Sequence, residues 1–117
     1  MGQALLSLTK PRWSIRVQDE FDWDPVKATT NVHKHGISFE EAMTVFADRL
    51  ALTIYDEAAA SLEERWITLG MNRRRRLVLV VHTHMQLSAM RAEIRIISAR
   101  KPTKAEVHDY ESGNNGR

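Results

Sequence analysis

Arginines at strand positions are the residues of this sequence best suited to chemistry. Arg65 begins one strand-like run, Arg95 lies between Ile94 and Ile96 inside another, and Arg100 ends that second run. Because strand side chains alternate between faces, Arg95 points to the face opposite the two isoleucines. Guanidinium groups stay charged and bind phosphate oxygens through paired hydrogen bonds. Arg65 and Arg95 on an open sheet face would suit a phosphodiester, although a mid-strand arginine is also often a solvated, outward residue.

Cleavage of RNA would need little beyond such cations, because RNA carries its own nucleophile, the 2′-hydroxyl. The protein must orient this hydroxyl, take its proton, protonate the leaving oxygen and neutralise the phosphate. Arginine and lysine supply the electrostatic part, and Glu64 or a histidine could act as the base. That scheme requires neither a metal ion nor a cofactor.

The five histidines do not predict a metal site. His33 and His35 are two apart on an expected helix and point to different faces. His82 and His84 are two apart on an expected strand and share a face. A zinc site needs three or four ligands, and no HExxH motif or cysteine set accompanies this pair. We expect surface or end-of-strand histidines instead. A glycine-rich phosphate loop and a GxSxG nucleophile elbow are also absent from the sequence.

Charge is distributed unevenly along the 117 residues, although the net charge is only +2. One basic run and one basic cluster contrast with acidic stretches at residues 19–24 and 56–64, which indicates a surface with a basic side. A solvated hairpin tip is the plainer alternative for the run. The expected RNA-binding residues are Arg73, Arg74, Arg75, Arg76, Lys101 and Lys104.

The sequence gives no sign of a membrane or secreted protein. No apolar stretch reaches the roughly 20 residues of a membrane helix. Residues 1–8 lack the basic start and long apolar region of a signal peptide. The absence of cysteine fits a reducing compartment. We therefore expect a cytoplasmic protein.

Helix-capping signals predict three helices. Asp24-Pro25 begins the first, and Gly36 ends it. Ser38 and Glu41 form a capping box for the second, which should extend to Asp48. A second capping box, Thr103 with Glu106, follows Pro102 and starts the last helix.

Strand-like runs cover residues 50–55, 65–69, 77–83 and 93–99, with a further short strand near residues 21–23. The run at 77–83 is apolar without alternation and should be central. The connection 71–76 predicts a hairpin. We expect an α+β fold in which two N-terminal helices and a C-terminal helix pack on one face of an antiparallel sheet. Residues 1–18 would be an N-terminal extension, 19–111 one domain and 112–117 a disordered tail.

The sequence resembles the BrnT toxins over residues 20–111. The ordered matches are Phe-Asp-Trp-Asp-Pro-Val-Lys-Ala at 21–28, Asn31, Lys-His-Gly-Ile-Ser-Phe-Glu-Glu-Ala at 34–42, Val-Phe-Ala-Asp at 45–48, Leu52-Thr53, Glu-Arg-Trp-Ile-Thr-Leu-Gly at 64–70, Leu-Val-Val-His-Thr at 79–83, Ile-Arg-Ile-Ile-Ser-Ala-Arg at 94–100, Glu106 and Tyr110. Residues 1–18 lie outside the pattern. The segment 84–92 is longer than the family's hairpin.

The resemblance implies a RelE-like fold and a ribonuclease toxin that stops translation and growth. It implies a cognate BrnA-like antitoxin with a DNA-binding part, so that operator DNA is bound only through the complex. Carried over by motif, the catalytic residues are Arg65, Arg95 and Arg100, with Glu64, Lys34, His35 and His82 as further candidates. Two alternatives remain open: a nucleic-acid-binding module without catalysis, and a degenerate toxin that acts only as a protein partner.

Overall fold

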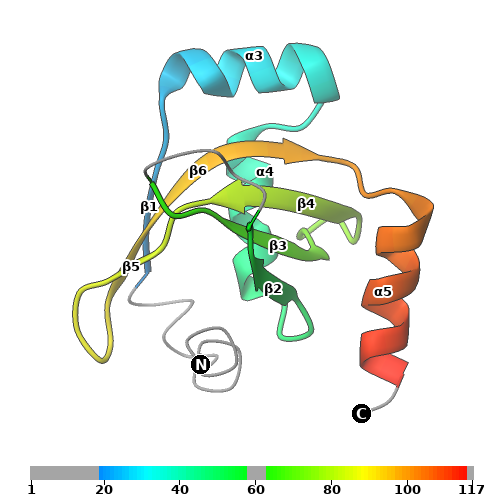
Figure 1. The fold of residues 1–117 in the computed structure, drawn as a ribbon. Coiled ribbons are helices and arrows are strands. Elements are labelled where there is room, and N and C mark those ends of the chain that lie inside the picture. Colours follow the sequence, from blue (N-terminus) through cyan, green and yellow to red (C-terminus); the bar gives the residue numbers. More distant parts are fainter. Residues whose placement is uncertain (1–18, 58–62, 116–117) are drawn as a thin grey trace.

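The computed structural model describes residues 19–57 and 63–115. These residues form a six-stranded sheet, three α-helices and one 3-10 helix (Figure 1). In chain order the elements are β1 (Asp19–Asp22), α3 (Pro25–His35), α4 (Phe39–Met43), the 3-10 helix η1 (Thr44–Ala47), β2 (Leu52–Tyr55), β3 (Trp66–Met71), β4 (Leu77–His82), β5 (Met85–Gln86), β6 (Ala92–Arg100) and α5 (Lys104–Asn115). The expected extension at residues 1–18 lies outside the described residues.

The sheet has the strand order β1-β6-β4-β3-β2, and the short β5 pairs with β6. The expected α+β class and the central place of the 77–83 run are confirmed. The sheet is not wholly antiparallel, however, because β1 runs parallel to β6. Almost the whole domain separates these two strands in sequence, and such a long connection allows parallel pairing.

One face of the sheet carries the main core. Buried side chains of α4 and η1 pack there against apolar residues of β4 and β6, which alternate with outward residues along each strand. The buried members of this core are Ile37, Phe39, Ala42, Val45, Phe46, Val78, Val80, Ile94, Ile96 and Ala99. The second helix was expected to extend to Asp48, but α4 ends at Met43 and the chain continues to Ala47 as the tighter η1.

Helix α3 is fixed through a buried asparagine. The Asn31 side-chain amide donates to the carbonyl oxygens of Ile37 and Ala99, and its oxygen accepts from the Ala99 amide. The helix ends where expected, at Gly36, whose φ of 69° lies in the left-handed region that favours glycine. Asn31 therefore ties the α3–α4 corner to β6.

Helix α5 packs on the other face of the sheet. Tyr110 of α5 lies against Leu69 of β3 and Leu79 of β4 in a second, smaller core. The expectation that all helices share one face is therefore wrong. The reason is geometric: β6 ends at Arg100, and residues 101–103 carry the chain to the face opposite α4. The expected domain end at residue 111 falls inside α5.

No helix in the described part of the chain is long and apolar enough to cross a membrane.

Candidate functional site

Five residues lie at one level across the sheet, and we call them the transverse row. Their order across the strands is Asp22, Arg95, Thr83, Arg65 and Asp56. The Asp22–Arg95 pairing comes from the β1–β6 register, and the Thr83 amide donates to the Arg95 carbonyl at 2.9 Å. Trp66 faces His82, so the next residues outward, Arg65 and Thr83, are neighbours. The Asp56 amide donates to the Arg65 carbonyl at 2.9 Å.

Side chains of the transverse row project from the face of the sheet that α5 occupies. Arg65 is two residues from Ile67, and Thr83 is two residues from Val81; both apolar residues belong to the α5 core. Arg95 lies between two isoleucines of the opposite core. Neighbouring strands are about 4.8 Å apart, and β4 lies between β3 and β6. The Cα atoms of Arg65 and Arg95 are therefore roughly 10 Å from each other. A phosphate group between them is within reach of both guanidinium groups.

A cleft of 340 Å³ opens at the β1–β6 side of the row. It is lined by Arg95 and Thr83, by apolar atoms of Phe21 and Met85, and by four acidic residues, Glu20, Asp22, Glu63 and Glu93. The Arg95 Nε lies 3.6 Å from the Asp22 carboxylate, and the Arg95 side chain is 54% exposed. An exposed pair of this kind contributes little to stability, so Arg95 can exchange partners.

The second arginine of the row has an unused donor. The Arg65 Nε is buried and finds no hydrogen-bond acceptor within residues 19–57 and 63–115. Buried polar atoms are nearly always paired, so an unpaired one requires an explanation. Less than 1 Å² of this atom is exposed, so an anion becomes its acceptor only after the Arg65 side chain moves.

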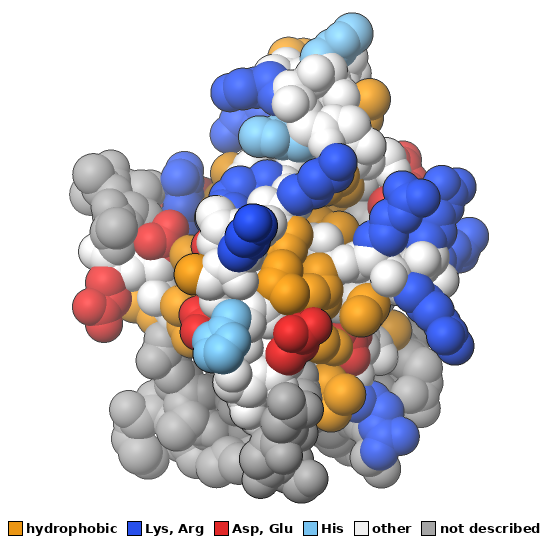
Figure 2. All heavy atoms as spheres, turned by 90° about the vertical axis from the view of Figure 1, so that its right-hand side faces the viewer, with side chains coloured by type: hydrophobic (Ala, Val, Ile, Leu, Met, Phe, Trp, Pro, Cys, Tyr) orange, Lys and Arg blue, Asp and Glu red, His pale blue; other side chains and the backbone are white. Residues whose placement is uncertain are grey.

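A second hollow, the basic groove, lies at the opposite end of the strands. It encloses 630 Å³ between the α3–α4 corner, the β3–β4 hairpin and the residues that follow β6. Its lining includes the charged residues Glu41, Arg74, Arg76 and Lys101, together with His35. Figure 2 shows Lys and Arg side chains gathered on both sides of an apolar strip below α3. Four of the predicted site residues therefore meet here: His35, Arg74, Arg76 and Lys101.

Comparison with known proteins identifies the family. A family model described as "Ribonuclease toxin, BrnT, of type II toxin-antitoxin system" matches residues 23–106, more than half of the chain. The chain belongs to the BrnT family. It is thus a ribonuclease toxin of a type II toxin–antitoxin system, a class that implies an RNA target and an antitoxin partner.

Among solved structures, the chain is similar to the Brucella abortus ribonuclease toxin BrnT, known at 1.1 Å resolution. The sequence identity is 18%, the TM-score is 0.45, and the alignment covers 75% of this chain and 100% of that one. No curated protein is significantly similar in sequence to the chain.

Arg100 of this BrnT chain is engaged in a structural ion pair. Its two terminal nitrogens donate to the Glu106 carboxylate at 2.9 and 3.0 Å, and the same carboxylate accepts from the Thr103 amide at the start of α5. The hydrogen bond from Arg100 lowers the pKa of Glu106 and, in return, raises the pKa of Arg100. Arg100 therefore anchors α5, and a phosphate would have to compete with Glu106 for it.

His82 is a core residue, which corrects its place among the candidate catalytic groups. Only 1% of the residue is exposed, and its ring packs edge-on against Phe46 at 4.8 Å. The Nδ1 atom donates to the Thr83 carbonyl, and the Nε2 atom shares a hydrogen bond of 2.7 Å with the Thr68 hydroxyl. Substrate has no access to either nitrogen. The sequence already indicated this burial, because His82 lies within the apolar run 77–83, which was expected to be a central strand.

The remaining predicted residues lie outside both linings. They are Lys34, Glu64, Arg73, Arg75 and Lys104. Conversely, the cleft contains Glu93 and Thr83, which sequence reasoning missed. Glu93 could have been found, because it is two residues from Arg95 on one strand and so shares its face. Within the described ranges, no group of three or more acidic or histidine residues could hold a metal ion.

Proposed function

We propose that this BrnT chain is an endoribonuclease that cleaves RNA at the transverse row, without a metal ion, and thereby inhibits translation. Arg65 and Arg95 bind the phosphate between two nucleotides from opposite sides. The observation that carries the proposal is their common level and common face, with Thr83 between them.

The proposed reaction is transphosphorylation within the RNA chain. The 2′-hydroxyl oxygen bonds to the adjacent phosphorus while the bond from phosphorus to the 5′-oxygen breaks. A carboxylate, Glu93 in the cleft or Glu64 beside Arg65, takes the proton of the 2′-hydroxyl and becomes a carboxylic acid. The leaving 5′-oxygen receives a proton from this carboxylic acid or from water. The products are a 2′,3′-cyclic phosphate and a 5′-hydroxyl. Two guanidinium groups neutralise the charge that builds on the phosphate oxygens.

The proposal is tested by incubating the purified chain with RNA in the presence of EDTA. We expect cleavage, and we expect a 2′-O-methyl RNA of the same sequence to stay intact because its nucleophile is blocked. Separate Glu64→Gln and Glu93→Gln variants identify the base as the one whose loss lowers kcat. Intact RNA in all samples would favour a module that binds nucleic acid without cleaving it, and cleavage that EDTA abolishes would contradict metal independence.

We further propose that the antitoxin is a BrnA-like protein that carries its own DNA-binding part, so that operator DNA is bound only by the complex. The family match supports the antitoxin partner, because it places the chain in a type II toxin–antitoxin system. Electrophoretic mobility shifts with operator DNA should appear with the complex and not with the toxin alone.

A further inference from the structure

The basic groove is positioned to solve an electrostatic problem of the proposed active site. Four carboxylates line the cleft that holds Arg95, whereas RNA carries a negative charge at every linkage. Binding energy for the rest of the chain must come from cations elsewhere on the surface. We propose that the basic groove is a second RNA subsite that binds phosphates of the single strand several nucleotides away from the linkage that is cut. This inference rests on the proposed function.

Charge in the groove is strongly one-sided. Arg74, Arg76 and Lys101 line it, and Glu41 is the single acidic residue in the lining. Glu41 already lies 3.6 Å from the Arg74 Nε and 4.0 Å from the Arg73 Nε. Neither Arg76 nor Lys101 makes an ion pair with any described residue. Two full positive charges are therefore available to a bound anion.

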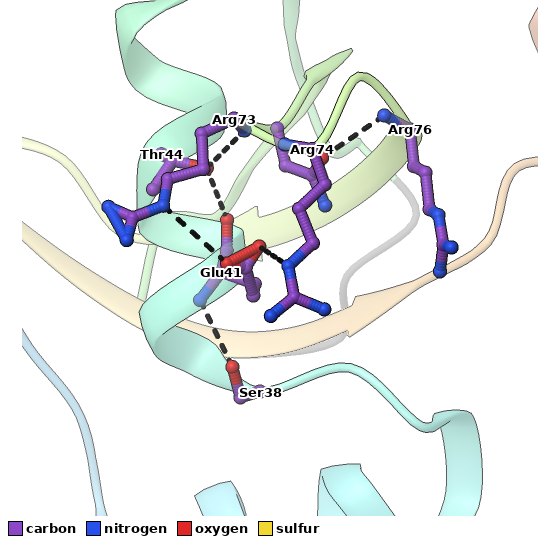
Figure 3. Close-up of polar contacts among 7 residues, drawn as sticks. Ser38, Glu41, Thr44, Arg73, Arg74 and Arg76 are labelled. Carbon is purple, nitrogen blue, oxygen red and sulfur yellow. Dashed lines mark hydrogen bonds and ion pairs between the residues drawn. The ribbon is translucent and has the colours of Figure 1, made fainter.

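Backbone structure holds these arginines in place. The Asn72 side-chain oxygen accepts from the amides of Arg74 and Arg76, and Arg75 takes a left-handed φ of 64° between them. The Arg73 amide donates to the Thr44 hydroxyl, which in turn donates to the Glu41 carbonyl (Figure 3). In Figure 3, Arg74 and Arg76 point in one direction from the hairpin, whereas Arg73 points away. A fixed hairpin loses little conformational entropy when it binds a ligand.

The lining between the cations is apolar. Val32, Ile37, Leu77 and Pro102 supply it, and Figure 2 shows an apolar strip with Lys and Arg side chains on both sides. Bases of a single strand can lie on such a surface while the phosphates contact the cations. An acidic protein segment would gain less from it, because carboxylate side chains bring no large flat group to cover the apolar strip. These features favour RNA as the occupant.

The separation between the groove and the transverse row sets the length of RNA that can reach both. Lys101 follows Arg95 by six residues and lies directly after the end of β6. At about 3.4 Å per residue, the groove lies roughly 20 Å from the transverse row. A long RNA can contact both sites, but a dinucleotide bound at the row cannot reach the groove.

The difference in substrate length gives the test. We compare the wild-type chain with an Arg76→Gln/Lys101→Gln variant, and use Arg49→Gln as a control that removes an exposed charge outside the groove. With a long single-stranded RNA we expect the double variant to raise KM about tenfold with unchanged kcat, and cleavage of a dinucleotide to stay unchanged. For the uncleavable 2′-deoxy strand, we compare the slope of the logarithm of the binding constant against the logarithm of the salt concentration. The double variant should have a slope smaller in magnitude by about 1.4 than the wild type, since each of two lost phosphate contacts contributes about 0.7.

Each outcome supports or overturns the subsite. Equal KM, affinity and salt slope for the double variant and the wild type would overturn it, as would an equal loss on the dinucleotide, which would indicate a general defect. Weaker binding of purified antitoxin with unchanged binding of the 2′-deoxy strand would overturn it in favour of a protein partner. If the wild type cleaves neither RNA, the proposed function fails, and binding of the 2′-deoxy strand still decides the subsite. Thermal unfolding confirms that the variants are folded.

Discussion

The hydroxyl of Tyr110 in α5 donates a 2.7 Å hydrogen bond to the carboxylate of Asp48, which lies 62 positions earlier in the chain. The same Asp48 oxygen accepts from the Met71 amide at 2.8 Å, and the other oxygen accepts from the Leu50 amide. A single carboxylate therefore joins α5, the end of η1 and the end of β3.

Replacing Tyr110 by phenylalanine should lower the free energy of unfolding by about 1 to 2 kcal/mol, because a largely buried hydrogen bond to a charged group is lost. Burial, with the Asp48 carboxylate next in importance, raises the pKa of Tyr110 far above its usual value of about 10. A group with a raised folded pKa contributes its full stability below the unfolded pKa. Chemical denaturation should therefore show a constant difference between the two proteins up to about pH 10, and the difference should shrink above it. No difference at pH 7 would contradict the assignment.

Arg65→Ala and Arg95→Ala should each relieve the growth arrest caused by expression of the toxin. We expect each change to lower kcat/KM for RNA by about 100-fold or more, because each removes one cation from the phosphate. Both variants should keep the far-UV circular dichroism of the wild type. Arg49→Ala is the matched control for loss of an exposed arginine. Full toxicity of both row variants would show that the reaction occurs elsewhere on the molecule.

Glu106→Gln tests the ion pair that anchors α5. The hydrogen bond from Arg100 lowers the pKa of Glu106 against the opposing effect of burial. A carboxyl group with a lowered folded pKa stabilises the fold above its unfolded pKa, about 4.3, and loses this contribution as the pH falls through the folded pKa. The variant should thus be less stable than the wild type at pH 7, by less than about 1 kcal/mol because the pair is partly exposed. The difference should disappear once the pH is below the folded pKa of Glu106. A double-mutant cycle with Arg100→Gln measures the coupling.

Gly70→Ala tests the packing between β3 and η1. A methyl group at Gly70 would lie 2.9 Å from the Ala51 Cβ and 3.0 Å from a Val45 methyl, both closer than normal contacts. We expect the free energy of unfolding to fall by about 1 to 3 kcal/mol from overpacking. Gly113→Ala in α5 is the matched control, since its nearest neighbour is 3.6 Å away. There the better helix propensity of alanine should leave stability unchanged or raise it by up to about 1 kcal/mol. Equal effects at both positions would refute the packing argument.

Local signals accounted for most of the secondary structure. Asp24-Pro25 and Gly36 marked both ends of α3, and the Thr103–Glu106 capping box marked the start of α5. These signals work because a cap depends on residues within one turn of the chain. The shortening of α4 was not predictable in this way, because the packing of Val45 and Phe46 against the sheet favours the tighter η1 there.

The sequence alone determined the family and the identity of the cations. Ordered motifs can be read from a sequence without its structure, and the alternation of strand side chains shows that Arg95 points away from Ile94 and Ile96. Tertiary structure decided which cations meet. Pairing of β3, β4 and β6 set Arg65 and Arg95 at one level, while the hairpin brought Arg74 and Arg76 beside Lys101 and His35. Tertiary structure also pairs Arg100 with Glu106 and buries His82 in the core. Strand register and chain reversal depend on contacts between distant residues, and no local pattern specifies them.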